Sequence, residues 1–178
     1  MNIVSDTNIL SSFAASEALD LLPALFVDPI ILIPPAVFQE LQDGLARGKE
    51  HLEAVLQAIT AKNIQVLELT AQEQRIVQEL PHKLNAGERE AIALCQNQKL
   101  LLLSNDKRAV RYCAAQNIRV LDLPRLLRLL WIDRVISRNE VEALIAKMEQ
   151  VENLTFATVQ KIRSPFVALP TGPWVRRN

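Results

Sequence analysis

The chain has few of the residues that cofactor-binding loops and redox sites require. It contains four glycines in 178 residues, too few for a Gly-x-x-x-x-Gly-Lys or a Gly-x-Gly-x-x-Gly phosphate loop. Its two cysteines, Cys95 and Cys113, have no second Cys or His at metal-ligand spacing, so we expect buried, reduced thiols. Aromatic residues make up 4% of the chain, and the core must therefore be built from Leu, Ile, Val and Ala.

An excess of charge of either sign is also absent. Twenty basic and twenty acidic residues give a net charge of +0, without the basic excess that marks many nucleic-acid-binding domains. An anionic substrate would have to be attracted by a local patch or by a bound metal. No uncharged apolar stretch reaches the roughly 20 residues of a membrane span, and no signal-peptide pattern precedes the first apolar run. We expect a cytoplasmic protein that has no membrane contact.

Short apolar runs alternate with amphipathic segments along the first 121 residues. Strands are expected at 2–6, 30–33, 64–69, 100–103 and 118–121. Helices are expected from 6–8 onward and at 16–26, 35–45, 50–61, 70–81, 88–97, 106–116, 123–132 and 138–150. This order predicts an α/β fold, a three-layer α/β/α sandwich with a central parallel sheet of four to five strands.

Four acidic residues occupy positions that suit a metal site. Asp6 and Asp106 each follow an apolar strand, while Glu40 and Glu88 belong to expected helices. Ligand sites in open parallel sheets form just beyond the carboxyl ends of the strands. Carboxylates gathered there would repel one another unless a cation held them together, and hard oxygen ligands suit Mg²⁺ or Mn²⁺.

Each of these acids also has a purely structural interpretation. Asp6 and Asp106 could cap helices, Glu88 could complement a helix dipole, and Glu40 could be solvated. Glu90 competes with Glu88 as a second acid in the same turn, and we favour Glu88 because it lies one turn from the core-facing Ala91 and Ile92. No Ser or Cys nucleophile with a His base is visible, and His51 and His82 are expected to face solvent.

Four short motifs give the chain a resemblance to a known family. They are Asp6-Thr7-Asn8-Ile9-Leu10, Glu40 within Pro35 to Leu41, Ala86-Gly87-Glu88-Arg89-Glu90, and Ser104-Asn105-Asp106. In this order they resemble PIN domains, metal-dependent ribonucleases of which many are toxins of toxin–antitoxin pairs. The resemblance covers residues 1 to about 135, and many relatives have Asp where this chain has Glu88 in a Gly-Glu variant.

The resemblance implies a role for each motif residue. Asp6, Glu40, Glu88 and Asp106 would be the metal-binding and catalytic acids around Mg²⁺ or Mn²⁺. Thr7, Asn8 and Ser104 would support those acids through hydrogen bonds. The implied reaction is endonucleolytic cleavage of RNA. Residues 1–135 would form the PIN-like nuclease domain, and residues 136–178 a C-terminal helix and Pro-rich tail packed on that domain or on a partner.

Basic residues and apolar helices suggest further contacts. Lys107 and Arg111 follow Asp106 and could bind substrate phosphates, with a solvated helix face as the alternative; Arg111 matches an Arg common at this place in the family. Apolar helices within 123–150 could expose a surface for a homodimer, and the tail could contact a partner copy or an antitoxin.

Two other functions remain open from the sequence. An aspartyl-phosphate phosphatase would also begin with an Asp at the end of a strand, but it normally has a second Asp two positions later, where this chain has Asn8. A PIN-fold binding module that acts only within a complex is the second alternative.

Overall fold

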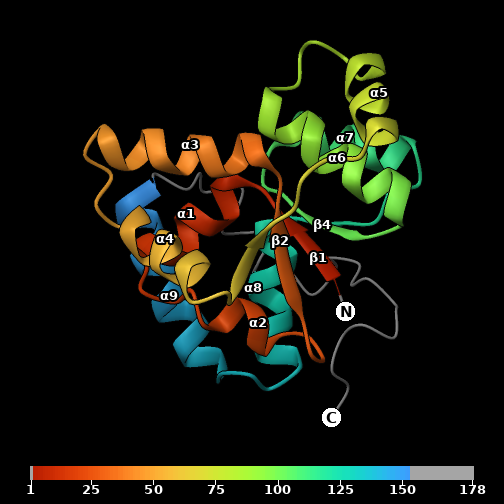
Figure 1. Ribbon diagram of the computed structural model, residues 1–178. Coiled ribbons are helices and arrows are strands. Elements are labelled where there is room, and N and C mark those ends of the chain that lie inside the picture. The colour runs from red at the N-terminus through yellow and green to blue at the C-terminus, as the bar shows by residue number, and fades with distance from the viewer. Residues whose placement is uncertain (1, 153–178) are drawn as a thin grey trace.

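The structure is a computed structural model that describes residues 2–152 and leaves residue 1 and residues 153–178, the Pro-rich tail among them, undescribed. Its centre is a five-stranded parallel sheet in the order β3-β2-β1-β4-β5 (Figure 1). The strands are β1 (Asn2–Ser5), β2 (Ile30–Ile33), β3 (Ile64–Val66), β4 (Leu101–Leu103) and β5 (Val120–Leu121). The predicted α/β fold with a central parallel sheet is confirmed.

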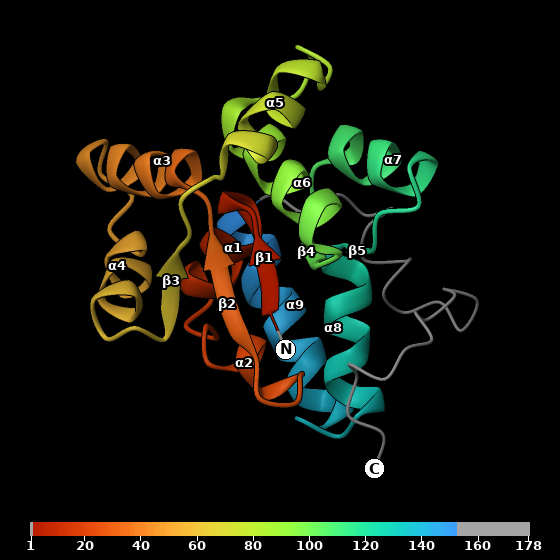
Figure 2. The same cartoon turned by 45° about the vertical axis from the view of Figure 1, so that its right-hand side comes forward.

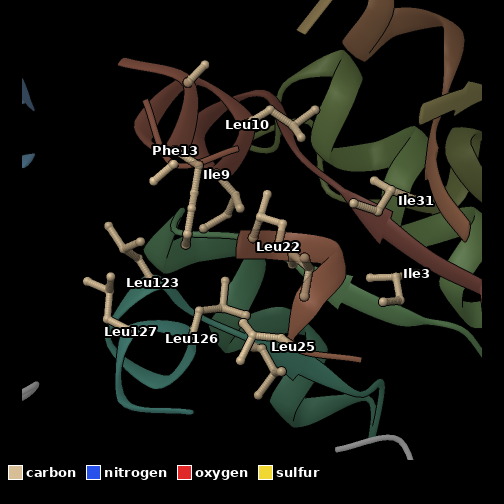
Figure 3. Close-up of a cluster of buried hydrophobic side chains, with 14 of the residues drawn as sticks. Ile3, Ile9, Leu10, Phe13, Leu22, Leu25, Ile31, Leu123, Leu126 and Leu127 are labelled. Atoms are coloured by element: carbon tan, nitrogen blue, oxygen red, sulfur yellow. The ribbon is translucent and has the colours of Figure 1, made fainter. Parts of the chain in front are cut away.

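The sheet separates two apolar cores, which explains why its strands read as continuous apolar runs. Alternate side chains of a strand point to opposite faces, so Ile3 and Ile31 enter one core while Val4 and Leu32 enter the other. Figure 3 shows the first core, where Ile3 and Ile31 lie with Phe13 and with side chains from the helices that cover this face.

Helices cover both faces of the sheet and one end of it. On one face lie α1 (Thr7–Ala15), α2 (Leu21–Ala24), α4 (Leu52–Thr60), α8 (Leu123–Ile132) and α9 (Arg138–Glu152). On the other lie α5 (Ala71–Glu79), α6 (Ala86–Gln98) and α7 (Lys107–Ala115). Helix α3 (Pro35–Ala46) starts at the carboxyl end of β2 and packs against α1, α4 and α6 (Figure 2). It therefore joins the two helix layers.

The order of the strands defines where a ligand site is expected. The chain moves outward from β1 to β2 and β3, then returns to place β4 on the other side of β1. The switch point of such a sheet, here between β1 and β4, opens a crevice at the carboxyl ends of the strands. The backbone N–H of Asp6 donates to the Leu103 carbonyl at 3.0 Å, which fixes the two strand ends against each other.

Several local predictions were wrong. Ser16 does not begin a helix: it ends α1, its N–H bonds to the Ser12 carbonyl, and Glu17 then takes a left-handed φ of 54° that reverses the chain. The helix expected at 16–26 is reduced to α2. Helix α6 begins two residues before Glu88, because the side chain of Asn85 caps it.

The apolar residues of α8 and α9 do not form an exposed surface. Leu123, Leu126, Leu127, Val141 and Ile145 are all buried in the first core. In the described residues, Val151 is the only large apolar side chain of these helices that is exposed. The expected apolar surface is therefore wrong for this part of the chain, and the homodimer remains a prediction without that support.

Both cysteines lie in the second apolar core of the sheet. Cys95 and Cys113 are free and buried, as expected. Burial raises the pKa of Cys113 to about 12 and that of Cys95 well above its usual value. Within residues 2–152, no helix combines the length and the apolar character needed to cross a membrane.

Candidate metal site at the carboxyl ends of the strands

Three of the four predicted acids line one cavity of about 220 Å³ beside the switch point. Asp6 enters it from the end of β1, Glu40 from α3 and Glu88 from the first turn of α6. These elements are far apart in sequence but meet where α3 packs against α1 and α6. The remaining lining residues are Thr7, Asn8, Ser11, Val37, Gly44, Arg47, Lys49, Leu52, Asn85 and Gly87.

Asp6 is the most buried of the acids, with 4% of its surface exposed. Its Oδ1 atom accepts a hydrogen bond from the Ile9 N–H at 2.8 Å and so caps α1. Its Oδ2 atom is buried and makes no hydrogen bond of normal geometry. Burial raises the pKa of Asp6 to about 6, although the nearby Ser104 hydroxyl and the amides of Ile9 and Asn105 oppose the rise.

Glu88 takes part in capping its own helix and interacts electrostatically with the other acids. It forms a capping box with Asn85: the Glu88 N–H donates to Asn85 Oδ1 at 2.7 Å, and Glu88 Oε2 accepts from the Asn85 N–H at 3.1 Å. Partial burial raises the pKa of Glu88, the Asn85 amide lowers it, and the negative charges of Asp106 and Glu40 raise it further.

Glu40 is held by contacts from two other elements. The Thr7 hydroxyl donates a hydrogen bond to its carboxylate, which joins α1 to α3. On the opposite side, a Cβ atom at position 87 would lie 2.9 Å from Glu40 Oε1 and 3.1 Å from Val37 Cγ2. A side chain at position 87 would therefore require Glu40 or Val37 to shift, a close approach of α6 to α3 that the sequence did not reveal.

Asp106 lies beside the cavity without lining it. Its Oδ1 atom caps α7 by accepting from the N–H groups of Arg108 at 2.6 Å and Ala109 at 2.9 Å. Its own N–H donates to Ser104 Oγ at 3.2 Å, so Ser104 connects the Asp106 loop to the surroundings of Asp6. The effect of Asp106 on the pKa of Glu88 shows that the two carboxylates are close enough to interact.

The carboxylate side chains have the chemistry to bind a hard divalent cation. Their arrangement in the structure does not form a complete metal site. In residues 2–152, no group of three or more His, Cys, Asp or Glu side chains could hold a metal ion as it stands. Yet Asp6 Oδ2 is a buried oxygen that makes no hydrogen bond of normal geometry, which is costly unless something binds it. Asp6 and Glu88 both have raised pKa values, which a nearby cation would lower.

Glu90, the rival of Glu88, has a different position. Its Oε2 atom accepts from the Ala36 N–H at 2.8 Å, at the N-terminus of α3, where a negative charge is favourable. Glu88 lines the cavity and Glu90 does not, while the role of Glu88 as a metal-site acid stays a prediction.

The predicted phosphate-binding residues Lys107 and Arg111 lie outside the cavity, and their role in substrate binding stays a prediction. Both side chains are exposed on α7. Arg47 and Lys49, which follow α3, do line the cavity. The expectation that His51 faces solvent was also wrong, because His51 is half-buried and its Nε2 atom lies 2.9 Å from Ser11 Oγ. The i, i+4 spacing of Thr7 and Ser11 on α1 could have indicated that Ser11 shares the cavity face.

The fold and the site define an α/β protein with acidic side chains around a cavity at the switch point of its parallel sheet. A family match identifies the family within this broad class. Residues 2–159 match the family DUF3368, described as a PIN domain. The chain belongs to this family. A search of curated proteins gave no significant match.

Two solved structures are similar to this chain. The crystal structure of VapBC2 from Rickettsia felis, bound to a DNA fragment from its promoter, is 18% identical with a TM-score of 0.50, covering 68% of this chain and 98% of that one. A domain of a functionally unknown protein from Methanocaldococcus jannaschii is 24% identical with a TM-score of 0.44, covering 68% and 90%. At this level of identity, the similarity to VapBC2 concerns the fold.

Proposed function

We propose that the protein is a metal-dependent endoribonuclease whose catalytic and metal-binding acids are Asp6, Glu40, Glu88 and Asp106. The observation that carries the proposal is Asp6 Oδ2, a buried carboxylate oxygen that makes no hydrogen bond of normal geometry and belongs to a residue lining the same cavity as Glu40 and Glu88. Membership of the PIN domain family supports the same reading. Mg²⁺ or Mn²⁺ is the proposed cofactor, because all the candidate ligands are carboxylate oxygens.

The protein's own residues would position the acids and the substrate. A divalent cation bound there would act as a Lewis acid toward the phosphodiester and lower the pKa of water. Thr7 orients Glu40 through its hydroxyl, Ser104 supports the Asp106 loop, and Asn8 offers an amide to the cavity. These contacts would hold the carboxylates in place while the substrate binds, which is how supporting hydrogen bonds act at metal sites.

Partners and setting follow from the family rather than from the cavity. The proposed substrate is RNA, and the proposed setting is the cytoplasm of a cell in which an antitoxin protein restrains the enzyme. A homodimer belongs to the same proposal. Residues 136–178 would contribute to these contacts, and α9 packs against α1 and α8 of the same chain.

Cleavage of a mixed panel of single-stranded RNAs with Mg²⁺, Mn²⁺ or EDTA tests the proposal. The wild type should cut in the presence of metal, while Asp6→Asn and Asp106→Asn should not cut. Glu90→Gln is the matched control, because Glu90 caps α3 outside the cavity. Cutting that persists in EDTA or in Asp6→Asn would refute the proposal. Metal binding without any cutting would favour the binding module.

A further inference from the structure

One end of the cavity is basic, and no role has been assigned to it. The residues that line the cavity from α3 are Val37, Glu40, Gly44 and, just past the end of the helix, Arg47. Their spacing of three and four residues places them on one face of the helix. Lys49 follows on the same side. The cavity therefore runs along α3 from an acidic end to a basic end.

The turn after α3 directs both basic residues toward the cavity. Gly48 separates them with a φ of 88°, a left-handed conformation that favours glycine. The N–H groups of Gly48 and Lys49 donate to the carbonyls of Leu45 at 2.9 Å and Gly44 at 3.1 Å and close the turn. The Lys49 stem folds back over Gly44, since a Cβ there would lie 3.7 Å from Lys49 Cδ.

These two cations are available for a ligand. In the described part of the chain, ion pairs include Arg125–Asp122, Arg138–Glu142 and Lys147–Glu17, and neither Arg47 nor Lys49 forms one. Both side chains are exposed, and the Ser11 hydroxyl lines the cavity beside its partner His51. A hydroxyl and two unpaired cations are common phosphate ligands.

We propose that Arg47 and Lys49 bind a phosphate of the single-stranded RNA substrate that neighbours the one at the acids, and so set the path of the strand along α3. This inference rests on the proposed function. Arg47 lies seven residues beyond Glu40, about 10 Å along a helix axis, so the basic end of the cavity can hold a different phosphate from the acidic end. The pair also offsets the repulsion that three cavity carboxylates exert on a polyanion. Lys107 and Arg111, which do not line the cavity, are not part of this path.

The test measures binding separately from cleavage. In an Asp6→Asn background, the affinity for a fluorescein-labelled, mixed-sequence RNA 12-mer is measured by anisotropy in Mg²⁺ at several salt concentrations. Arg47→Gln/Lys49→Gln removes both charges but keeps most of the aliphatic stems. Lys107→Gln/Arg111→Gln is the matched control with the same loss of charge. Thermal unfolding of each variant checks that the fold is intact.

Removal of both charges should weaken binding by roughly tenfold or more. It should also reduce the slope of log affinity against log salt by about 0.7, since each neutralised phosphate of a single strand contributes about that much and the pair binds one phosphate. The single variant Lys49→Arg, which keeps Arg47 unchanged and preserves both charges, should retain most of the affinity for RNA. In single-turnover cleavage by the otherwise wild-type chain, the double change should raise the half-saturating RNA concentration more than it lowers the maximal rate.

Failure of this inference is distinguishable from failure of the proposed function. If the wild type cleaves RNA but the Arg47/Lys49 variant binds with an unchanged salt slope, the path along α3 is wrong and the nuclease stands. If only Lys107→Gln/Arg111→Gln lowers the slope, the strand runs over α7 instead. If the wild type neither binds nor cleaves RNA, the proposed function fails, and this inference fails with it.

Discussion

Gly87 and Glu40 contact each other across the interface of α6 and α3 so closely that a Cβ atom at position 87 would lie 2.9 Å from Glu40 Oε1. Gly87 also immediately precedes Glu88, so this close approach of α6 to α3 lies beside two of the cavity's acids. The position of Glu40 therefore depends both on the lack of a side chain at Gly87 and on the Thr7 hydroxyl that donates to its carboxylate.

Gly87→Ala should displace Glu40 and disturb the site. The added methyl group must push away Glu40 or Val37, and overpacking of this kind costs about 1–3 kcal/mol of unfolding free energy. Denaturant unfolding and calorimetric titration with Mn²⁺ should show lower stability and weaker metal binding. Ala86→Ser, at an exposed neighbouring position, is the control and should change neither. Unchanged Mn²⁺ affinity in Gly87→Ala would separate Glu40 from the metal site.

Asp6→Asn should stabilise the metal-free protein at neutral pH. Burial raises the pKa of Asp6 from 3.8 to about 6, so the unfolded chain releases this proton at lower pH than the folded chain does. Stability therefore falls as pH rises through this window, by up to about 3 kcal/mol above pH 6. Asn removes the charge and still caps α1.

Unfolding of both proteins in EDTA between pH 3.5 and pH 8 measures this effect. The advantage of Asp6→Asn should be largest above pH 6 and vanish near pH 3.5. Asp20→Asn, at an exposed position whose side chain makes no capping bond, should show no such dependence. A loss of stability in Asp6→Asn across this range would mean that the carboxylate serves as a cap and not as a repelled site anion.

Glu73→Ala should destabilise the fold without affecting catalysis. Glu73 is fully buried, and its carboxylate accepts from the amides of Asn97 at 3.0 Å and Gln98 at 2.8 Å, which ties α5 to the end of α6. Burial opposes ionisation, but these amides and the N–H and hydroxyl of Thr70 outweigh it and lower the pKa of Glu73. Removal of the carboxylate breaks these hydrogen bonds to half-buried or exposed donors and leaves a gap at a buried position, at a cost of about 1–3 kcal/mol.

The contribution of Glu73 to the free energy of unfolding should depend on pH. A lowered pKa means that its stabilisation is present above the unfolded-state pKa and is lost as pH falls through the folded-state value. Thermal unfolding from pH 7 down to pH 2 should show the gap between wild type and Glu73→Ala closing at the acid end. Glu79→Ala, exposed on the same helix, should match the wild type throughout. An RNA cleavage defect in folded Glu73→Ala would contradict a purely structural role.

Substitutions of Glu88 and Glu90 should have different effects on cleavage and on stability, although the two residues share a helical turn. Glu88→Gln should abolish cleavage, because Glu88 lines the cavity and interacts with Glu40 and Asp106. Glu90→Ala should lower the unfolding free energy by about 1 kcal/mol, because its carboxylate caps α3, while cleavage persists. Cleavage rates and unfolding curves of the two variants decide the matter; the reverse pattern would reassign the acid.

The sequence predicted the sheet well because its strands are buried on both faces. Runs such as Leu101–Leu103, bounded by turn residues and helices, have few alternatives to parallel strands. Ser16 was misjudged because a cap-forming residue can also end a helix, and the left-handed Glu17 that decides between the two is not visible in sequence. Local signals thus located the elements better than their ends.

The candidate site was only partly predictable for a similar reason. Asp6 and Asp106 could be found because a parallel sheet gathers its strand ends at one edge. The contact between Gly87 and Glu40, the Ser11–His51 pair and the return of Lys49 over Gly44 all depend on how helices pack. Such contacts join residues up to about fifty positions apart, which periodicity along one helix cannot show.

The most direct measurement is a parallel titration of Mn²⁺ binding and RNA cleavage in wild type, Asp6→Asn and Glu90→Gln. If the cavity carboxylates hold the ion on which cleavage depends, the Mn²⁺ concentration for half-maximal cleavage will equal the dissociation constant from calorimetry. Both signals will be lost in Asp6→Asn and retained in Glu90→Gln. Cleavage that needs no bound Mn²⁺, or full Mn²⁺ binding and cleavage in Asp6→Asn, would contradict the account.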